Sequence, residues 1–330
     1  MFEIDPSHYR NFIFGIISKK NLARRKWHKF TLWEEELILF WNKGDVRCYK
    51  NYCPHYGLPL DQGKLTDGHI QCGLHAWKFQ LSDGKFVSAP YTKKSPNCGL
   101  VGHKAFIEQG MVFVYTGDEE YFETAKGYTI GNVLEDQVSG HVEYEVPFYL
   151  ALNSGIDYAH FPFHKFFFQA YRIYRWVSFN KNSMLTSYTP TLVEETDAYF
   201  KYVIEETGSE ITVYPFCINH FDPKSSNQWQ TFISPISETK SIYLNTLKSD
   251  SSNCIYRMLC YLGFHTIVIS ALHEDKKWLE SIYPNFKKGR NINLCDHDFH
   301  LKKYLSKFIT QPKSKSKNPS GQKNILFSGR

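Results

Sequence analysis

Residues 53–77 read CPHYGLPLDQGKLTDGHIQCGLHAW, and they hold the strongest chemical signal in the sequence. Two cysteine–histidine pairs frame this stretch, the first spaced C-x-H and the second C-x-x-H: Cys53 with His55, and Cys72 with His75. A proline follows the first cysteine and a glycine follows the second, which favours two tight loops that face each other. Thiolates and imidazoles gathered on two loops predict a transition-metal site with two ligands of each kind.

This ligand set fits a [2Fe–2S] cluster of the Rieske type, in which two thiolates hold one iron and two imidazoles hold the other. Cys53 and Cys72 would bind the first iron. His55 and His75 would bind the second. A zinc site uses the same residue types, but usually as paired cysteines followed by paired histidines. Because each pair here is mixed, the cluster is the favoured interpretation and zinc the alternative.

A second group of candidate ligands lies in residues 153–164, NSGIDYAHFPFH. On a helix, residues four apart share a face, so His160 and His164 could point at one metal ion. Pro162 lies between them and would distort such a turn. Taken alone, two histidines in an aromatic run are as often structural as they are ligands.

At these two groups the sequence resembles one known family, the catalytic alpha subunits of the Rieske non-heme iron oxygenases. Residues 53–60, 63–65 and 72–77 look like the family's cluster loops. Leu74 and Ala76 stand where the family usually has tyrosine and glycine, so a hydroxyl that tunes the cluster potential is missing. The resemblance covers nearly the whole chain, up to about residue 310.

The family's catalytic domain carries Asp-x-x-His followed, after three or four residues, by a second histidine. Asp157, His160 and His164 match this pattern with the shorter interval. The resemblance implies a mononuclear Fe(II) held by two histidines and one carboxylate, with open positions for O2 and substrate. It also implies that Asp157 links a cluster histidine of a neighbouring subunit to an iron-ligand histidine. The alternative role for Asp157 is a helix N-cap.

The third iron ligand should be a carboxylate far along the chain. Residues 273–280, HEDKKWLE, lie in a segment whose apolar spacing suits a helix. The family places its carboxylate in a similar Glu-Asp pair followed by Leu-Glu, so the resemblance assigns Asp275. The alternatives are Glu274, Asp296 and Asp298.

Short β-type runs fill residues ~30–117, and further alternating runs lie between residues ~142 and ~245. The first set predicts a small antiparallel β domain with the cluster at its tip. The second predicts one larger antiparallel sheet whose aromatics wall a substrate pocket. The fold class is α+β, and the resemblance implies a helix-grip, START-like catalytic domain. The expected domains are residues 1–118, with an N-terminal segment before the cluster domain, then 119–310, and a disordered basic tail over 311–330.

Composition and charge limit the number of domains, the type of partner and the location that we expect. The chain has 330 residues, 42% apolar and 17% aromatic, which suits two domains with a large core. The net charge of +6 falls largely in the tail, so we expect no nucleic-acid groove. Eight cysteines without a signal peptide predict a reducing, cytoplasmic location. The apolar run at 255–272 is short and impure for a span of about 20 residues, so we expect a buried helix and no membrane partner.

The resemblance implies an oxygenase that hydroxylates or oxidatively demethylates an aromatic, polycyclic or natural-product substrate. Because no Gly-rich nucleotide fingerprint is present, electrons from NAD(P)H would arrive through a separate reductase or ferredoxin. The implied assembly is a homotrimer. The alternatives are a Rieske electron carrier whose second domain only binds, and a zinc-stabilised binding protein.

Overall fold

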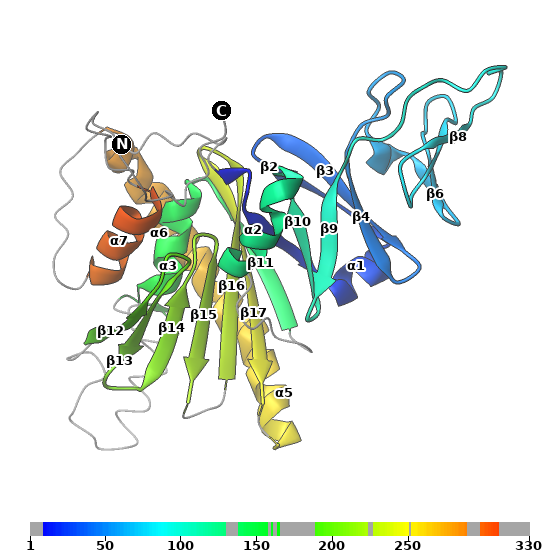
Figure 1. Ribbon diagram of the computed structural model, residues 1–330. Coiled ribbons are helices and arrows are strands. Elements are labelled where there is room, and N and C mark those ends of the chain that lie inside the picture. The colour runs from blue at the N-terminus through cyan, green and yellow to red at the C-terminus, as the bar shows by residue number, and fades with distance from the viewer. Residues whose placement is uncertain are drawn as a thin grey trace.

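The chain folds into two β-rich regions with helices packed on the second (Figure 1). The computed structural model describes residues 9–129, 138–157, 160, 164–165, 189–223, 227–250, 252–288 and 298–309. The predicted basic tail over 311–330 lies outside the described residues, and so do Pro162 and Asp296.

The first region is built on a six-stranded antiparallel sheet. Its strands are β1 (Ile13–Ser18), β2 (Trp27–Leu32), β3 (Glu35–Asn42), β4 (Asp45–Lys50), β9 (Gly102–Glu108) and β10 (Met111–Tyr115). Their order is β1-β10-β9-β4-β3-β2. Helix α1 (Lys19–Arg25) follows β1, and α2 (Phe122–Thr129) follows β10. Every residue of β10 is buried, because its two neighbours cover its edges and apolar side chains cover both of its faces.

A smaller sheet extends from one end of this region and carries the cysteine–histidine loops (Figure 1). Its strands are β5 (Lys64–Thr66), β6 (His69–Gln71), β7 (Lys78–Gln80) and β8 (Phe86–Ser88), paired in that order. A separate apolar cluster supports it, and this cluster includes Phe79 of β7 and both Cys53 and Cys72. The loops therefore stand on a packed base.

The first region begins earlier than the sequence predicted. The alternating pattern indicated strands from residue ~30, yet β1 already pairs with β10 and places Ile13 opposite Tyr115. The run Ile13–Ser18 is short and contains a glycine, so its own pattern is weak. Its pairing with a buried strand makes it part of the sheet.

The second region is a seven-stranded antiparallel sheet. Its strands are β11 (Val138–Tyr144), β12 (Pro190–Glu195), β13 (Phe200–Ile204), β14 (Ser209–Val213), β15 (Cys217–Asp222), β16 (Asn227–Ser237) and β17 (Lys240–Ser249). Their order is β11-β17-β16-β15-β14-β13-β12. Helix α3 (Phe148–Ile156) packs on β15, β16 and β17, and α6 (Ile269–Lys287) packs on β11. Helix α7 (Phe299–Tyr304) contacts α3. The predicted α+β fold with a large antiparallel sheet is confirmed.

The two regions share one hydrophobic core around the ring of Phe216. The ring centroids of Phe14 in β1 and Phe148 in α3 each lie 4.8 Å from that of Phe216. The carbonyl of Gly15 accepts a hydrogen bond of 3.3 Å from the Ser234 hydroxyl in β16. A Cβ on Gly15 would meet the ring of Phe232 at 2.7 Å, so β1 approaches β16 as closely as only glycine allows.

A single long helix runs from Cys254 to Lys287 and spans 34 residues. It consists of α5 (Cys254–Gly263), a π-helical turn (Phe264–Val268) and α6. In α5, which the structure describes in full, no residue is buried. The prediction of a buried helix over 255–272 is therefore wrong for its first half. Among the described residues this is the one helix long and apolar enough to cross a bilayer, and 17% of its most apolar window is buried.

We expect Phe216→Ala to lower the free energy of unfolding by about 3–5 kcal/mol, because it removes a buried ring from the core that both regions share. Urea denaturation followed by tryptophan fluorescence measures this. The control is Val193→Ala, since Val193 is 53% exposed, and it should change stability by less than about 0.5 kcal/mol. Equal stability of the two variants would contradict a shared core.

Candidate metal centres

The four predicted cluster ligands lie on two loops of the same backbone design. The N–H of Cys53 donates to the carbonyl of Leu58, five residues on, at 2.8 Å. The N–H of Cys72 donates to the carbonyl of Trp77, again five residues on and again at 2.8 Å. Each cysteine thus opens and closes its own tight loop, with a histidine at the tip.

Both loops turn through a left-handed residue four positions after the cysteine. The N–H of Gly57 donates to the carbonyl of Cys53, and that of Ala76 donates to the carbonyl of Cys72. Gly57 has φ 77° and Ala76 has φ 57°. Glycine adopts this conformation without strain, whereas alanine does not. Ala76 therefore stands where this backbone favours the glycine that the family usually has.

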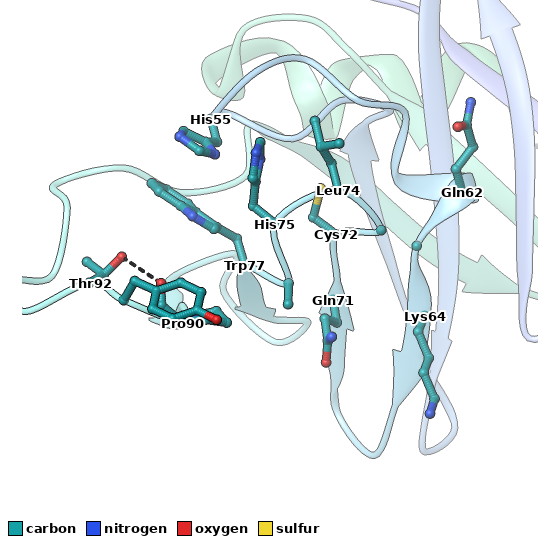
Figure 2. Close-up of a pocket in the computed structure, with 14 residues that line it drawn as sticks. His55, Gln62, Lys64, Gln71, Cys72, Leu74, His75, Trp77, Pro90 and Thr92 are labelled. Carbon is teal, nitrogen blue, oxygen red and sulfur yellow. Dashed lines mark hydrogen bonds between the residues drawn. The ribbon is translucent and has the colours of Figure 1, made fainter.

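The side chains of the two loops converge, as Figure 2 shows for His55, His75 and Trp77. The centroids of the two imidazoles lie 4.7 Å apart, and the indole of Trp77 stacks on His55 at 4.3 Å. Cys53 and Cys72 are 1% and 3% exposed. The concave surface beside them is lined by both loops and by residues 90–92.

The cysteines and histidines of the two loops fit an iron–sulfur cluster, because hydrogen bonds do not satisfy all of their polar atoms. The Nδ1 atom of His55 is buried and has no hydrogen-bond partner among the described residues. Burial and the neighbouring Cys72 raise the pKa of Cys53 to about 11, although nearby backbone N–H groups act in the opposite direction. A bound metal would convert such thiols to thiolates and would occupy the free nitrogen.

The second centre places Asp275 between two imidazoles. Its Oδ1 atom lies 3.2 Å from Nε2 of His160 and 3.3 Å from Nε2 of His164. One potential ligand atom from each of the three residues lies within 4.8 Å of the others. His164 and Asp275 are buried. Two histidines and one carboxylate around one point are the donor set of mononuclear non-heme iron sites.

The outer nitrogens of both imidazoles face carboxylates. Nδ1 of His164 lies 3.1 Å from Oε2 of Glu274, which also accepts a hydrogen bond from the N–H of Lys165. Nδ1 of His160 lies 3.5 Å from Oδ2 of Asp157. Glu274, the alternative ligand, thus lies behind His164 and not in the metal group. Such outer carboxylates orient metal-binding imidazoles and raise their basicity.

The charges of this centre favour a cation. Burial lowers the pKa of His160, but hydrogen bonds to Asp157 and Asp275 outweigh burial and raise it to about 9. Burial raises the pKa of Asp275, but hydrogen bonds from His160 and His164 hold it below its ordinary value. The carboxylates thus stabilise positive charge at the point where a divalent ion would bind.

The end of α3 lies next to this centre. Helix α3 ends at Ile156, and Asp157 is its C-cap, with its N–H donating to the carbonyl of Asn153 at 2.9 Å. The alternative of an N-cap is therefore wrong. Of the residues that follow, the structure describes His160 in a single turn and His164 at a bend. Residues 161–163 lie outside the described residues, and with them the expected helical turn between the two histidines.

His300 is a neighbour of the centre that sequence reasoning missed. It lies in α7, is fully buried, and its Nε2 atom is 3.9 Å from Oδ1 of Asp157. From the sequence we considered only Asp296 and Asp298 of this segment as candidate ligands and did not single out His300. The alternation of Phe299 and Leu301 with polar residues was the available signal. Asp298 is the residue before α7 and is absent from the metal group that the described residues form.

Parts of the sequence resemble known proteins. A family profile described as the Rieske [2Fe-2S] domain matches residues 13–109. Chlorophyllide a oxygenase of Chlamydomonas reinhardtii is 26% identical over 185 residues, which are 54% of this chain and 28% of that protein. Cholesterol 7-desaturase nvd of Xenopus laevis is 31% identical over 145 residues, 40% of this chain and 32% of that protein. The matched segment spans about a third or less of these relatives.

The whole chain also has a counterpart among solved structures. In the reduced complex between oxygenase and ferredoxin in carbazole 1,9a-dioxygenase, a chain of the same fold matches with a TM-score of 0.67 and 18% identity. The match covers 95% of this chain and 94% of that one. Residues 13–109 thus match a Rieske domain, and the chain as a whole shares the fold of that oxygenase chain.

We expect Glu274→Gln to weaken Fe(II) binding at the second centre by about 10–100-fold, because the carboxylate that orients His164 is lost. Anaerobic titration of the iron-depleted centre with Fe(II) measures the affinity. The control is Glu210→Gln, since Glu210 pairs with Lys201 on the surface of the large sheet and should leave binding unchanged. Unaltered binding in Glu274→Gln would mean that His164 is held by other contacts.

Opposite changes in stability are expected when the left-handed residue of each cluster loop is exchanged for the residue of the other loop. Gly57→Ala should lower the free energy of unfolding by about 1 kcal/mol, because only its positive φ opposes a side chain and no atom lies within 4 Å of a Cβ there. Ala76→Gly should raise it by up to about 1 kcal/mol through relief of the same strain. Denaturation of the cluster-loaded protein measures both. Changes of equal sign would contradict the shared loop design.

Proposed function

We propose that the chain is a Rieske-type oxygenase that inserts oxygen from O2 into an organic substrate. The observation that carries this proposal is the placement of Asp275 between His160 and His164 in a chain that also has a Rieske domain. An electron carrier needs only the cluster loops. Three converging ligands with outer carboxylates have no role in a domain that merely binds, so the carrier is the less favoured alternative.

His160, His164 and Asp275 would hold a mononuclear Fe(II), and Cys53, His55, Cys72 and His75 would hold the cluster. When bound, the ferrous ion supplies the chemistry of O2 activation. The residues of the chain set its surroundings. Trp278 stacks on His164 at a centroid distance of 4.9 Å and covers the centre from one side, which limits access of water.

Asp157 is the proposed link to the cluster of a neighbouring subunit. One side of its carboxylate faces Nδ1 of His160, and the side chain is 25% exposed, so it connects the buried centre with the surface. His300 lies on its other side and limits its freedom to rotate. A homotrimer in which each Rieske domain meets the Asp157 of the next subunit is the assembly we propose.

Electrons would come from NAD(P)H through a separate reductase or ferredoxin. Apolar side chains surround the cluster histidines at the surface: Tyr56 is 74% exposed and Leu74 is 55% exposed. Such a patch beside the loop tips suits the docking of a redox protein. The oxygenase of the related solved complex binds a ferredoxin, which supports the same class of partner here.

The proposed substrate is a largely apolar organic molecule, aromatic, polycyclic or a natural product, that undergoes hydroxylation or oxidative demethylation. Names of the relatives point to large ring systems, chlorophyllide and cholesterol. Asn245 pairs with Gly140, which faces Ile269 of α6. Trp229 is on the same face of the sheet as Asn245, so this face carries both an aromatic and a polar side chain. Apolar walls with few polar groups are typical of such pockets. The cytoplasmic location remains a prediction.

Metal content tests the proposal. Anaerobically purified protein should hold about three irons and about two acid-labile sulfides per chain, and His160→Ala should hold about two irons with the sulfide unchanged. Asp157→Asn should keep all the iron but slow electron transfer from the reduced cluster to the second centre, measured in a single turnover. About two irons in both wild type and His160→Ala would indicate an electron carrier, and zinc without sulfide would contradict the cluster itself.

A further inference from the structure

Helix α5 exposes an apolar stripe on the side that faces away from the protein. Its members recur at helical spacing and so share one face: Ile255 at 62% exposure, Met258 at 61%, Leu259 at 56% and Leu262 at 59%. Four large apolar side chains in two turns exceed what isolated surface residues explain. The stripe therefore needs an apolar environment that the described chain does not supply.

The opposite face of the same helix is more polar, although it lies on the protein. The amide nitrogen of Asn227 in β16 donates to the hydroxyl of Tyr256 at 3.3 Å and contacts Sγ of Cys260 at 3.8 Å. Only Phe264, at the end of this face, is fully buried. The helix thus turns its hydrogen-bonding groups inward and its aliphatic groups outward, the reverse of an ordinary surface helix.

The charge pattern around the stripe suits an anionic surface. No aspartate or glutamate occurs between Asp250 and Glu274. Arg257 is exposed on α5, about 100° around the helix axis from Met258, and Tyr261 lies closer to the edge of the stripe. Long basic side chains that reach the headgroups and tyrosines at the edge of an apolar stripe are typical of helices that lie in the headgroup region of a membrane.

The outward face changes character along the helix. Beyond Leu262 the same face continues with Thr266, Ser270 and His273, which are exposed and polar, and then with Lys277. Only the first two turns are apolar, although the whole helix is long enough to cross a bilayer. This pattern fits shallow insertion of α5 and not a membrane span.

The position of α5 separates it from the electron-transfer surfaces. Figure 1 shows α5 projecting beyond the end of the large sheet, far from the small sheet that carries the cluster loops. A neighbouring subunit that brings its cluster to Asp157 would approach the region of α3 and α7. At 1.5 Å per residue the stripe begins about 20 Å from Asp275 along the helix axis and ends about 30 Å from it.

We propose that α5 docks the protein on the surface of a phospholipid bilayer by inserting its apolar stripe at headgroup depth. The docking goes beyond the oxygenase activity and does not depend on it. It would hold the end of the helix that carries Asp275 at a fixed height above the lipid.

Sedimentation of the full chain with vesicles tests the docking. Wild-type protein should co-sediment with vesicles of phosphatidylcholine and phosphatidylglycerol, and the double variant Leu259→Glu, Leu262→Glu should bind at least tenfold more weakly. The matched control is Val193→Glu, which adds a charge at an exposed apolar position outside α5 and should bind like wild type. Iron and sulfide content should be equal in all three proteins, which shows that each is folded.

Arg257→Gln should weaken binding several-fold to the vesicles with phosphatidylglycerol and leave binding to pure phosphatidylcholine unchanged. Failure of the wild type to bind either vesicle, or equal binding by the double variant, would overturn the proposal. A smaller oligomer for the double variant in light scattering would also overturn it, because the stripe would then be an interface between copies of the chain. None of these readouts depends on oxygenase activity.

Discussion

The carboxylate of Asp275 lies within 3.3 Å of two imidazole nitrogens. The packing of the whole second region must keep these three side chains together. The two histidines follow α3, whereas Asp275 lies in α6, so most of the large sheet intervenes in the sequence. The sheet must hold both helices in register. One such tie is the hydroxyl of Tyr144 in β11, which donates to the carbonyl of Leu272 one turn before Asp275. Small shifts of either helix would separate the ligands.

The junction between the two β-rich regions restricts how the two metal centres can work together. The rings around Phe216 and the close approach of Gly15 to β16 join the regions through a continuous core. A packed core of this kind does not act as a hinge. The cluster loops lie at the far end of the first region in Figure 1, away from α3 and α7. Delivery of electrons from another subunit is consistent with this rigidity, whereas closure within one chain is not.

Much of the architecture could be predicted, because the alternation of apolar and polar residues in the sequence matches the alternation of buried and less buried residues in the strands. Residues 200, 202 and 204 of β13 are buried, and the sequence alternates accordingly. β15 has a weaker pattern in the sequence, since Cys217–Asp222 has a polar second half and is held mainly by its neighbours β14 and β16. The convergence of the two cysteine–histidine loops could be predicted from local spacing. Asp275 required the family resemblance, because no local pattern joins it to a histidine more than a hundred positions earlier.

The structure differs most from the expectations based on sequence at α5 and at His300. The apolar run predicted a helix over 255–272. Periodicity shows which side chains share a face of a helix but not what covers that face, and in α5 no residue is buried. The lysines that follow His300 suggest a solvated segment in the sequence, although Leu301 and Tyr304 beside it are buried in the structure. Neither burial nor the distance of 3.9 Å to Asp157 follows from sequence, because both depend on how α7 packs against α3.

The order of the ligands along the chain has a consequence for biosynthesis. His160 and His164 emerge from the ribosome after β11 but before the other six strands of the large sheet, and Asp275 emerges after all of them. The second centre therefore cannot assemble until β12 to β17 have paired and α6 has packed on β11. The cluster loops are complete within the first 77 residues and depend on no later segment for their ligands. A chain that ends before Asp275 therefore lacks one of the three converging side chains of the second centre, whereas all four candidate ligands of the first are already present.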